Sequence, residues 1–315
     1  MKKSFGKCIF ICGGVIDSSL DPETSETSES LLVLCKNKTI ILPKVPQISK
    51  NNTKYLITKV LMMSYTNIKK LLVSDGKSCQ IFQNGQWKYH SELLERRYMG
   101  GLMITMPNGI YVFGSRCGGE TEDIMKSSVF LPNGKNIWQK GPKIPGPGFA
   151  SGHGVAISPT EIVFTGGARS PFRVLKYNIV TNQWTHLKNL KVGREFHASV
   201  FFNGKIFLAG GSSTIRTDAN GFIVSRRSNS TEIYCPMTET SKMGGNMNMH
   251  RKYFEIGILR DMDGISKMLA IGGGTDESIS IKGTSSIEVW DDKEEKWLMS
   301  HRELSLPRYS FSLCF

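Results

Sequence analysis

A short apolar run that ends in two adjacent glycines recurs along this chain, as in FICGG, VFTGG, FLAGG and LAIGG. Two weaker copies, LLVSDG and YVFGS, lie between them. The first position of the glycine pair, or of its counterpart in a weaker copy, is 13, 75, 114, 166, 210 or 272, so neighbouring copies are 39 to 62 residues apart. Periods of this size indicate repeated supersecondary units. The pattern therefore predicts one unit repeated six times.

Each copy contains the signals of a hairpin just before its glycines. HASVFF precedes Asn203-Gly204 and KIFLAGG follows it, and Asn108-Gly109 separates two apolar runs in the same way. Asn-Gly between apolar runs is a strong hairpin signal because both residues tolerate positive φ. Other copies carry Ser158-Pro159-Thr160, Asp263-Gly264 or Thr66-Asn67 there. We expect each unit to contain a two-stranded hairpin at this place.

Aromatic residues follow the glycines at a regular distance. Tyr177 stands seven residues before Trp184, and Trp290 stands seven before Trp297. Glycines let backbones approach closely, and large rings fill the space between adjacent units. Ser241 occupies the expected tryptophan position of one copy, and LLVLCKNKTIIL has none, so looser packing is expected there. Looser versions of the motif end at Trp87 and Trp138.

The glycine pairs, these two aromatic spacings, and Arg194 and Arg308 before the next strand together resemble the kelch-repeat β-propellers. The resemblance implies an all-β, six-bladed kelch β-propeller with four antiparallel strands per blade. It covers residues 1–315 as a single domain. Only the propeller is matched, without the BTB and BACK domains that precede it in kelch-like adaptors.

The two ends of the chain suggest how the ring closes. The segment from Arg308 to Phe315 reads as a first strand without a hairpin partner, and GKCIFICGG reads as a second strand with none before it. We expect the C-terminal strand to pair with the N-terminal strand around Phe10. Such closure removes the exposed edges of an open sheet.

Composition excludes several other classes of protein. Thirty-two glycines and 39% hydrophobic residues without helical periodicity argue against an α/β enzyme. No stretch approaches the roughly 18 apolar residues of a membrane span, and the N-terminal apolar run matches a blade strand better than a signal peptide. Seven cysteines, an odd number placed mostly in expected strands, favour a reduced, cytoplasmic protein.

Catalytic motifs are absent from the sequence. It contains no P-loop, HExxH, CxxC or GxSxG, and its six histidines stand apart. The glycine-rich run at 145–154 has no helix after it to bind phosphate. We therefore expect no catalytic residues, cofactor or metal. The alternative implied by the resemblance is a propeller enzyme, of the sugar mutarotase or metal-dependent oxidase or lyase type, with its site in the central channel.

The charge of the chain favours acidic partners. Forty basic against 27 acidic residues give a net charge of +13, and such a field attracts anions over a distance that salt shortens. Several cations lie where one unit connects to the next, so they are expected around the channel mouth, suited to carboxylates or phosphates. The alternative is that these arginines belong to the packing of the repeat. The candidate partner-binding residues are Arg97, Arg194, Arg251, Arg308, Arg169, Arg216 and Arg226.

Two long segments after glycine pairs are candidate recognition loops. Residues 17–30 are acidic and rich in hydroxyl groups, whereas residues 213–230 carry Arg216, Arg226 and Arg227. The acidic segment is either a plain solvated loop or a phosphorylatable one that competes with ligands for the basic face.

These features predict a protein–protein interaction module that binds an acidic or phosphorylated peptide or protein at its loop-lined face. The resemblance implies substrate recognition for a Cullin-3 type ubiquitin ligase, whose other components would be reached through another chain. Nucleic acid is disfavoured because the cations are spread through every unit and no RNP-like strand or basic helix is present.

Overall fold

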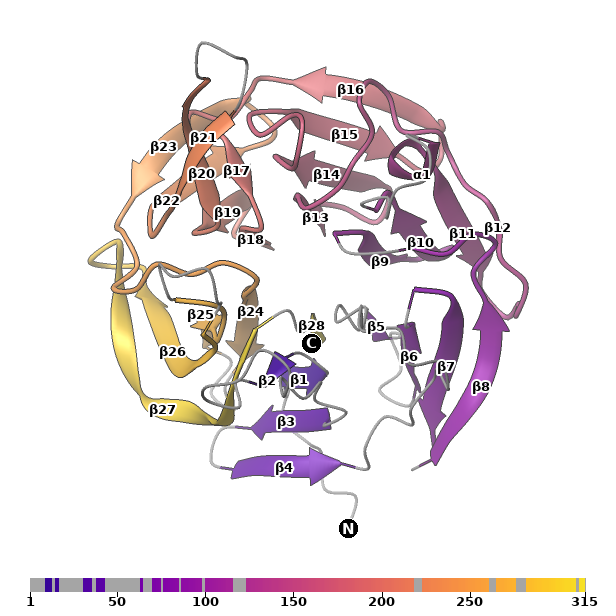
Figure 1. The fold of residues 1–315 in the computed structure, drawn as a ribbon, viewed down its shortest axis with the longest axis horizontal. Helices are drawn as coiled ribbons and strands as arrows, with labels where there is room; N and C mark the ends of the chain where they lie inside the picture. Colours follow the sequence, from indigo (N-terminus) through magenta and orange to yellow (C-terminus); the bar gives the residue numbers. More distant parts are fainter. Residues whose placement is uncertain are drawn as a thin grey trace.

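The structure, a computed structural model, describes residues 9–12, 15–16, 31–35, 38–42, 63–64, 70–74, 76–84, 86–97, 100–115, 123–217, 223–260, 265–275, 282–309 and 312–314. The strands in these ranges form antiparallel sheets that stand side by side around a common centre (Figure 1). One short helix, α1 (Asp123–Lys126), occurs in the described ranges. The protein is therefore all-β, as the sequence predicts.

Six of the sheets formed by the described strands have four or five strands, and we number them along the chain. The first sheet, in the order β28-β1-β3-β4, contains Ile9–Cys12 (β1), Leu31–Cys35 (β3), Lys38–Leu42 (β4) and Ser312–Cys314 (β28). The second contains Met63–Ser64 (β5), Lys70–Ser74 (β6), Ser78–Gln83 (β7) and Gln86–Glu92 (β8). The third contains Leu102–Met106 (β9), Gly109–Phe113 (β10), Ser128–Pro132 (β11) and Gln139–Lys140 (β12).

The remaining sheets follow the same plan with two additions. The fourth contains His153–Ala156 (β13), Glu161–Thr165 (β14), Val174–Asn178 (β15) and Gln183–Leu187 (β16). The fifth contains Ala198–Phe202 (β18), Lys205–Ala209 (β19), Thr231–Cys235 (β22) and Thr240–Gly244 (β23). The sixth, in the order β2-β27-β26-β25-β24, contains Val15–Ile16 (β2), Glu255–Arg260 (β24), Ser266–Ile271 (β25), Thr284–Asp291 (β26) and Lys296–Tyr309 (β27). A smaller sheet, the hairpin sheet, contains Arg194–Glu195 (β17), Ser212–Thr217 (β20) and Ile223–Arg227 (β21).

Within the described residues the expected hairpin turns are present, with one shift of position, whereas Thr66-Asn67 and Asp263-Gly264 lie outside the described residues. Asn203 and Gly204 both have positive φ, and Phe202 pairs with Lys205 across them, which confirms that turn. In the third sheet Gly109 already pairs with Met106. The two-residue turn is therefore Pro107-Asn108 and not the predicted Asn108-Gly109.

The glycine pairs let the connection to the next sheet pass close to the end of the second strand. Gly210 and Gly211 have φ of 63° and 84°, a region that favours glycine. The Gly211 amide donates to the Arg251 carbonyl at 2.7 Å, and a Cβ on Gly210 would lie 2.5 Å from that oxygen. The pair therefore joins the fifth sheet to the connection that leads into the sixth.

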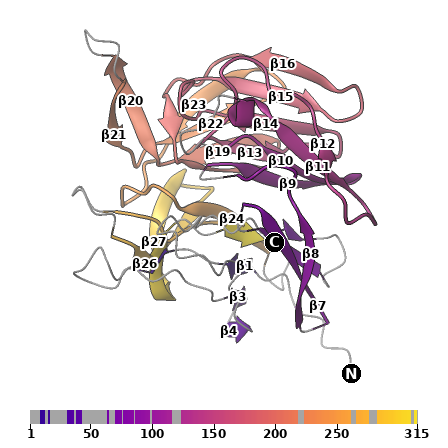
Figure 2. The same cartoon turned by 45° about the vertical axis from the view of Figure 1, so that its right-hand side comes forward.

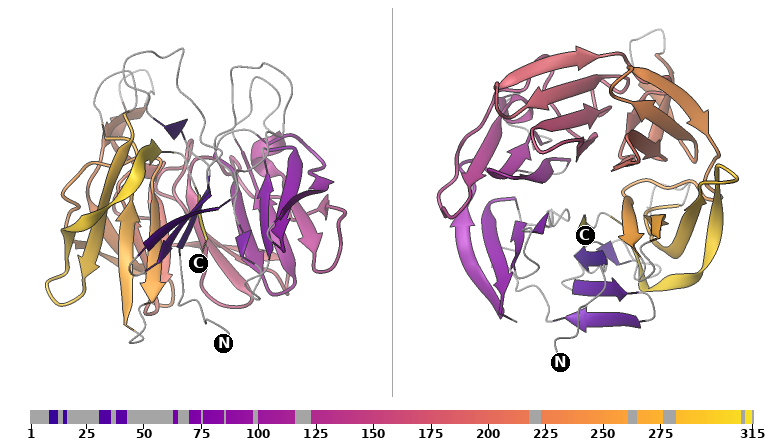
Figure 3. Two further views of the ribbon diagram at one scale, coloured as in Figure 1. Left: turned by 90° about the horizontal axis from the view of Figure 1, so that it is seen from below. Right: turned by 180° about the vertical axis from the view of Figure 1, so that it is seen from behind.

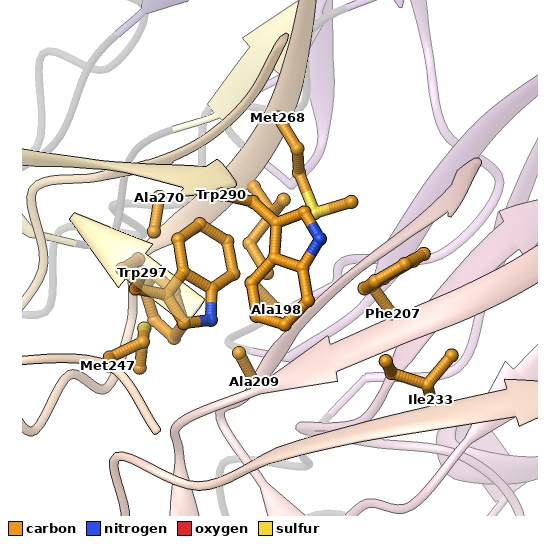
Figure 4. Packing of buried hydrophobic residues seen from close by; sticks show 11 residues of the cluster. Ala198, Phe207, Ala209, Ile233, Met247, Met268, Ala270, Trp290 and Trp297 are labelled. Atoms are coloured by element: carbon orange, nitrogen blue, oxygen red, sulfur yellow. The ribbon is translucent and has the colours of Figure 1, made fainter. Parts of the chain in front are cut away.

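Tryptophans fill the space between adjacent sheets. Trp290 and Trp297 of the sixth sheet pack against Ala198, Phe207 and Ala209 of the fifth (Figure 4). The Trp297 indole also donates to Thr231 Oγ1 at 2.9 Å. The predicted role of these rings is confirmed.

The copy that lacks the tryptophan uses a different residue at its interface. Ser241 pairs with Tyr234 across β22 and β23. The Tyr234 ring is buried, and its hydroxyl donates to the Lys188 carbonyl at 3.0 Å, beyond the fourth sheet's last strand. It packs in a cluster with Leu187 and Leu208. The side chains of LLVLCKNKTIIL lie outside those that the structure describes.

The two ends of the chain come together in the first sheet, which stands between the second and the sixth (Figure 3). β1 pairs antiparallel with β28, with Phe10 opposite Cys314. β2 pairs with β27, with Val15 opposite Tyr309, so the N-terminal segment also joins the sixth sheet. Phe315 and Cys8 themselves lie outside the described residues.

Residues 213–230 form structure that the sequence analysis did not predict. The expected long loop contains β20 and β21, which pair with each other and with β17. This hairpin sheet projects beyond the other sheets at one face of the molecule (Figure 2). Recognition residues on it are thus held on strands. Within the described ranges no helix has the length and hydropathy needed to cross a membrane.

Candidate partner-binding face

Four of the predicted binding residues are buried inside the protein. Arg97 is 1% exposed, and Arg194, Arg251 and Arg308 are each 0% exposed. The expectation that their guanidinium groups surround the channel mouth is therefore wrong. Arg308 moreover belongs to β27, opposite Thr284, and does not lie in a connection after that strand.

The buried arginines bind the protein's own backbone. Arg194 Nη1 donates to the carbonyl oxygens of Gly210 and Ser230 at 3.0 Å each, and Nη2 donates to Ser230 Oγ at 2.8 Å. Arg251 repeats the arrangement one sheet later with Gly272 and Ser286. Burial lowers the pKa of Arg194 to about 10, and the nearby Glu232 opposes that shift. The group thus stays charged at neutral pH. This geometry supports the alternative interpretation that these arginines belong to the packing of the repeat.

Each arginine also uses its main chain to hold the preceding sheet. The Gly167 amide donates to the Arg194 carbonyl at 2.8 Å, while the Arg194 side chain binds Gly210 of the fifth sheet. Arg251 bridges Gly211 and Gly272 in the same way. We call Arg97, Arg194, Arg251 and Arg308 the clamp arginines, because Arg194 and Arg251 each connect two successive sheets and all four are buried at equivalent places.

The other three predicted residues lie at the face from which the hairpin sheet projects. Arg169 is exposed and follows the glycine pair of the fourth sheet, with φ of 67°. Arg226 is exposed on β21, and Arg216 lies on β20 opposite Val224. The Arg216 side chain is not among those described. These three remain candidates for partner binding. The acidic segment 17–30 lies outside the described residues.

A chain of main-chain hydrogen bonds crosses this face from one sheet to the next. The Ser151 amide donates to the Gly100 carbonyl at 2.9 Å, the Phe196 amide to Ser151 at 2.7 Å, and the Tyr253 amide to Phe196 at 3.1 Å. All four residues have positive φ, between 55° and 78°. Non-glycine residues are strained in this backbone conformation and adopt it only where the surrounding structure imposes it.

Two of these strained residues present aromatic rings beside the hairpin sheet. The Phe196 and Tyr253 rings have centroids 4.3 Å apart, and Tyr309 lies 6.4 Å from Tyr253. Lys252 Nζ stands 5.6 Å from the Tyr253 ring centroid. None of these residues was selected from the sequence. An aromatic residue stands two positions after both Arg194 and Arg251, and this repeated spacing is the signal that would have found the Phe196 and Tyr253 rings.

A second group of polar residues bridges three innermost strands. His153 at the start of β13 places Nδ1 2.8 Å from Ser199 Oγ on β18 and Nε2 3.2 Å from Glu255 Oε2 on β24. With Glu255 ionised, Nε2 donates to the carboxylate and Nδ1 accepts from the Ser199 hydroxyl. Ser199 is only 3% exposed. The histidines that stand alone in the sequence are thus partly brought together with polar residues of other sheets. Over the described residues no group of three or more His, Cys, Asp or Glu side chains has the arrangement to hold a metal ion.

Comparison with known proteins identifies the repeat. The family model for the Kelch motif matches residues 193–248, the segment that begins just before the clamp residue Arg194 and includes the hairpin and fifth sheets. No curated protein matches the chain at a significant level. The Kelch match agrees with the repeated antiparallel sheets, the glycine pairs and the clamp arginines, and residues 193–248 carry a Kelch motif.

Proposed function

We propose that this protein is a single-domain, six-bladed β-propeller that binds an acidic or phosphorylated protein partner at the face from which the hairpin sheet projects. Each of the six larger sheets is one blade, and the pairing of β1 with β28 closes the ring. Closure leaves no blade edge open between the first and last repeats. Kelch repeats generally mediate protein interaction, which supports a protein partner.

The observation that carries the proposal is the hairpin sheet itself. Its paired strands β20 and β21, which carry Arg216 and Arg226, project from the ring (Figure 2). Arg169 is exposed after the glycine pair of the fourth sheet, and the chain has a net charge of +13. Rigid presentation of cations lowers the ordering cost of binding, and electrostatic complementarity speeds association with an acidic surface.

Affinity purification with matched charge variants tests this proposal. Reversal of Arg169, Arg216 and Arg226 to glutamate is expected to lose the main captured partner. The control reverses Lys135, Lys205 and Lys267, three exposed lysines at turns on the opposite ends of strands, and changes the net charge equally. Equal capture by both triple variants would refute a role for this face.

The cellular setting that we propose is substrate recognition for a Cullin-3 type ubiquitin ligase in the cytoplasm, reached through another chain. The resemblance to kelch-like adaptors supports this setting. Cullin-3 and a BTB-containing protein should then co-purify with the wild-type chain. Co-purification of the acidic partner without either of them would restrict the function to binding alone.

An enzyme remains the alternative function, and one observation favours it. Glu255, His153 and Ser199 form a hydrogen-bonded chain of acid, base and hydroxyl across three sheets, the order of groups that activates a serine nucleophile. We expect no reaction of Ser199 with a fluorophosphonate probe, because its hydroxyl is covered. Covalent labelling that disappears in Ser199→Ala, measured by mass spectrometry, would establish the enzyme.

A further inference from the structure

We propose that Arg227, Lys252 and Tyr253 form an anion site that receives one carboxylate or one phosphate monoester. This inference rests on the proposed function, because the anion is taken to be a side chain of the acidic partner. None of the three residues was among the predicted binding residues. We call them the anion site.

The strand register places Arg227 toward the junction of the fifth and sixth sheets. Arg227 pairs with Ser212, and Ser212 pairs with Glu195, so their side chains share one face of the hairpin sheet. Phe196, the residue after Glu195, accepts a hydrogen bond from the Tyr253 amide. Lys252 is thereby brought beside this face from the connection that enters the sixth sheet.

The two cations of the anion site are close enough to influence each other. The pKa of Lys252 is lowered, and burial is the largest cause. The positive charge of Arg227 also lowers this pKa, whereas the negative charge of Glu195 raises it. Among the described residues neither Lys252 nor Arg227 forms a salt bridge. Two like charges held close together are unfavourable, and the single charge of Glu195 offsets only one of them. The site is therefore electrostatically complementary to an added negative charge.

Arg227 also has an unused donor. Its Nη1 atom is buried, and no described group accepts a hydrogen bond from it. A buried donor without an acceptor calls for an explanation, since nearly all such groups are paired in folded proteins. An oxygen of a bound anion would supply the acceptor.

The chemistry around the two cations selects a small oxyanion. A guanidinium binds the two oxygens of a carboxylate or phosphate in a fork, and an ammonium adds a point charge. The Phe196 and Tyr253 rings, which contact each other at a tilt of 41°, form an apolar wall on the Lys252 side. Glu195 leaves the group with a net charge of about +1, which favours a single anionic side chain over a highly charged polymer.

Protection of Lys252 from acetylation tests the anion site on the full chain. The protein receives short pulses of an acetylating N-hydroxysuccinimide ester, and the modification of each lysine is measured by mass spectrometry. The probes are three decapeptides of the same glycine, serine and tyrosine sequence, with a central glutamate, phosphoserine or glutamine. We expect the glutamate or the phosphoserine peptide to slow acetylation of Lys252 at least threefold, while the glutamine peptide has no effect. The peptide that protects better identifies the source of the anion.

Three variants make the test specific. Arg227→Gln should abolish the protection, and Lys267→Gln, which removes the same charge from an exposed site at the far end of β25, should keep it. Glu195→Gln should increase the protection, since it removes a competing negative charge. Thermal melting checks that each variant is folded.

The outcomes separate this inference from the proposed function. Equal protection in the Arg227→Gln and Lys267→Gln proteins, or no protection by either anionic peptide, overturns the anion site even if a partner is still captured through Arg169, Arg216 and Arg226. Protection that depends on Arg227 supports the anion site even if the charge reversals leave partner capture unchanged.

Discussion

At the scale of single residues, arginine does two different jobs in this protein. Arg194 is wholly buried and holds two carbonyl oxygens in place, whereas Arg226 is exposed on a projecting strand. A guanidinium suits both because its donors form a rigid fork and its charge persists at any physiological pH. Partner binding should accordingly be sought at the exposed arginines and not at the clamp residues.

Replacement of a clamp arginine should destabilise the fold. Arg194→Met removes the guanidinium donor from the Gly210 carbonyl and leaves the Ser230 carbonyl with the Gly210 amide alone, so we expect the free energy of unfolding to fall by about 2 to 4 kcal/mol. Urea denaturation followed by tryptophan fluorescence measures the change. Arg226→Met is the control and should change stability by less than about 0.5 kcal/mol. Equal midpoints for the two variants would show that the clamp contributes nothing.

The lowered pKa of Lys252 predicts a pH effect with a definite sign. Lysine is acetylated as the neutral amine, so a lower pKa moves the rise of the reaction to lower pH. Arg227→Gln removes a neighbouring positive charge, and the pKa of Lys252 should rise toward the ordinary lysine value. The acetylation profile of Lys252, normalised to its own plateau, should therefore shift to higher pH in this variant. An unchanged profile would mean that the two groups do not interact.

At the scale of the element, three kinds of contact join neighbouring sheets, and all three occur at the boundary between the fifth and sixth sheets. The amide of a glycine pair donates to the connection that leads to the next sheet, and the side chain of a clamp arginine binds carbonyl oxygens of that next sheet. A tryptophan ring fills the wedge-shaped space between the two sheets. The tryptophan contact recurs at another boundary: the Trp138 indole of the segment after β11 donates to Ser91 of β8 at 3.0 Å, as Trp297 does to Thr231. Stability is thus built mainly from contacts between neighbouring sheets, as in other repeat proteins.

Truncation of a wedge ring should weaken the boundary between the fifth and sixth sheets. Trp297 is 3% exposed, and Trp297→Ala removes both its packing and its hydrogen bond to Thr231. The expected loss is about 3 to 5 kcal/mol, measured by urea denaturation. Met299→Ala, on the same strand but 47% exposed, provides the control and should cost less than about 1 kcal/mol. A loss as small as that of the control would contradict the wedge role.

At the scale of the whole molecule, the innermost strands of different sheets contact one another around the centre. His153, Ser199 and Glu255 link β13, β18 and β24 by hydrogen bonds, so three sheets are joined at their inner edges as well as through their wedges. The first sheet takes β28 from one end of the sequence and β1 from the other. β1 and β28 are held together by strand pairing alone, since no loop connects one directly to the other.

A circular permutant tests the proposed closure. Joining residues 315 and 1 through a short glycine–serine linker and opening the chain between Asn203 and Gly204 should leave the fold intact, because β18 and β19 pair over five residues without the turn. Removal of residues 312–315 instead deletes β28 and should lower the free energy of unfolding by several kcal/mol. Circular dichroism and urea denaturation measure both variants. A permutant that fails to fold while the truncated chain is fully stable would contradict closure.

The sequence was sufficient to predict the repeated unit but not the residues of the binding face, because the first depends on local signals and the second on contacts between distant segments. Glycine pairs, hairpin turns and the seven-residue aromatic spacing are local signals, since the residues that interact, such as Tyr177 and Trp184, are neighbours across one turn. The burial of Arg194 depends on carbonyls 16 and 36 residues away. The anion site joins Lys252 to a strand of another sheet. Only the tertiary structure brings such segments together, and it alone decided which arginines face solvent and which cations form no salt bridge with another described residue.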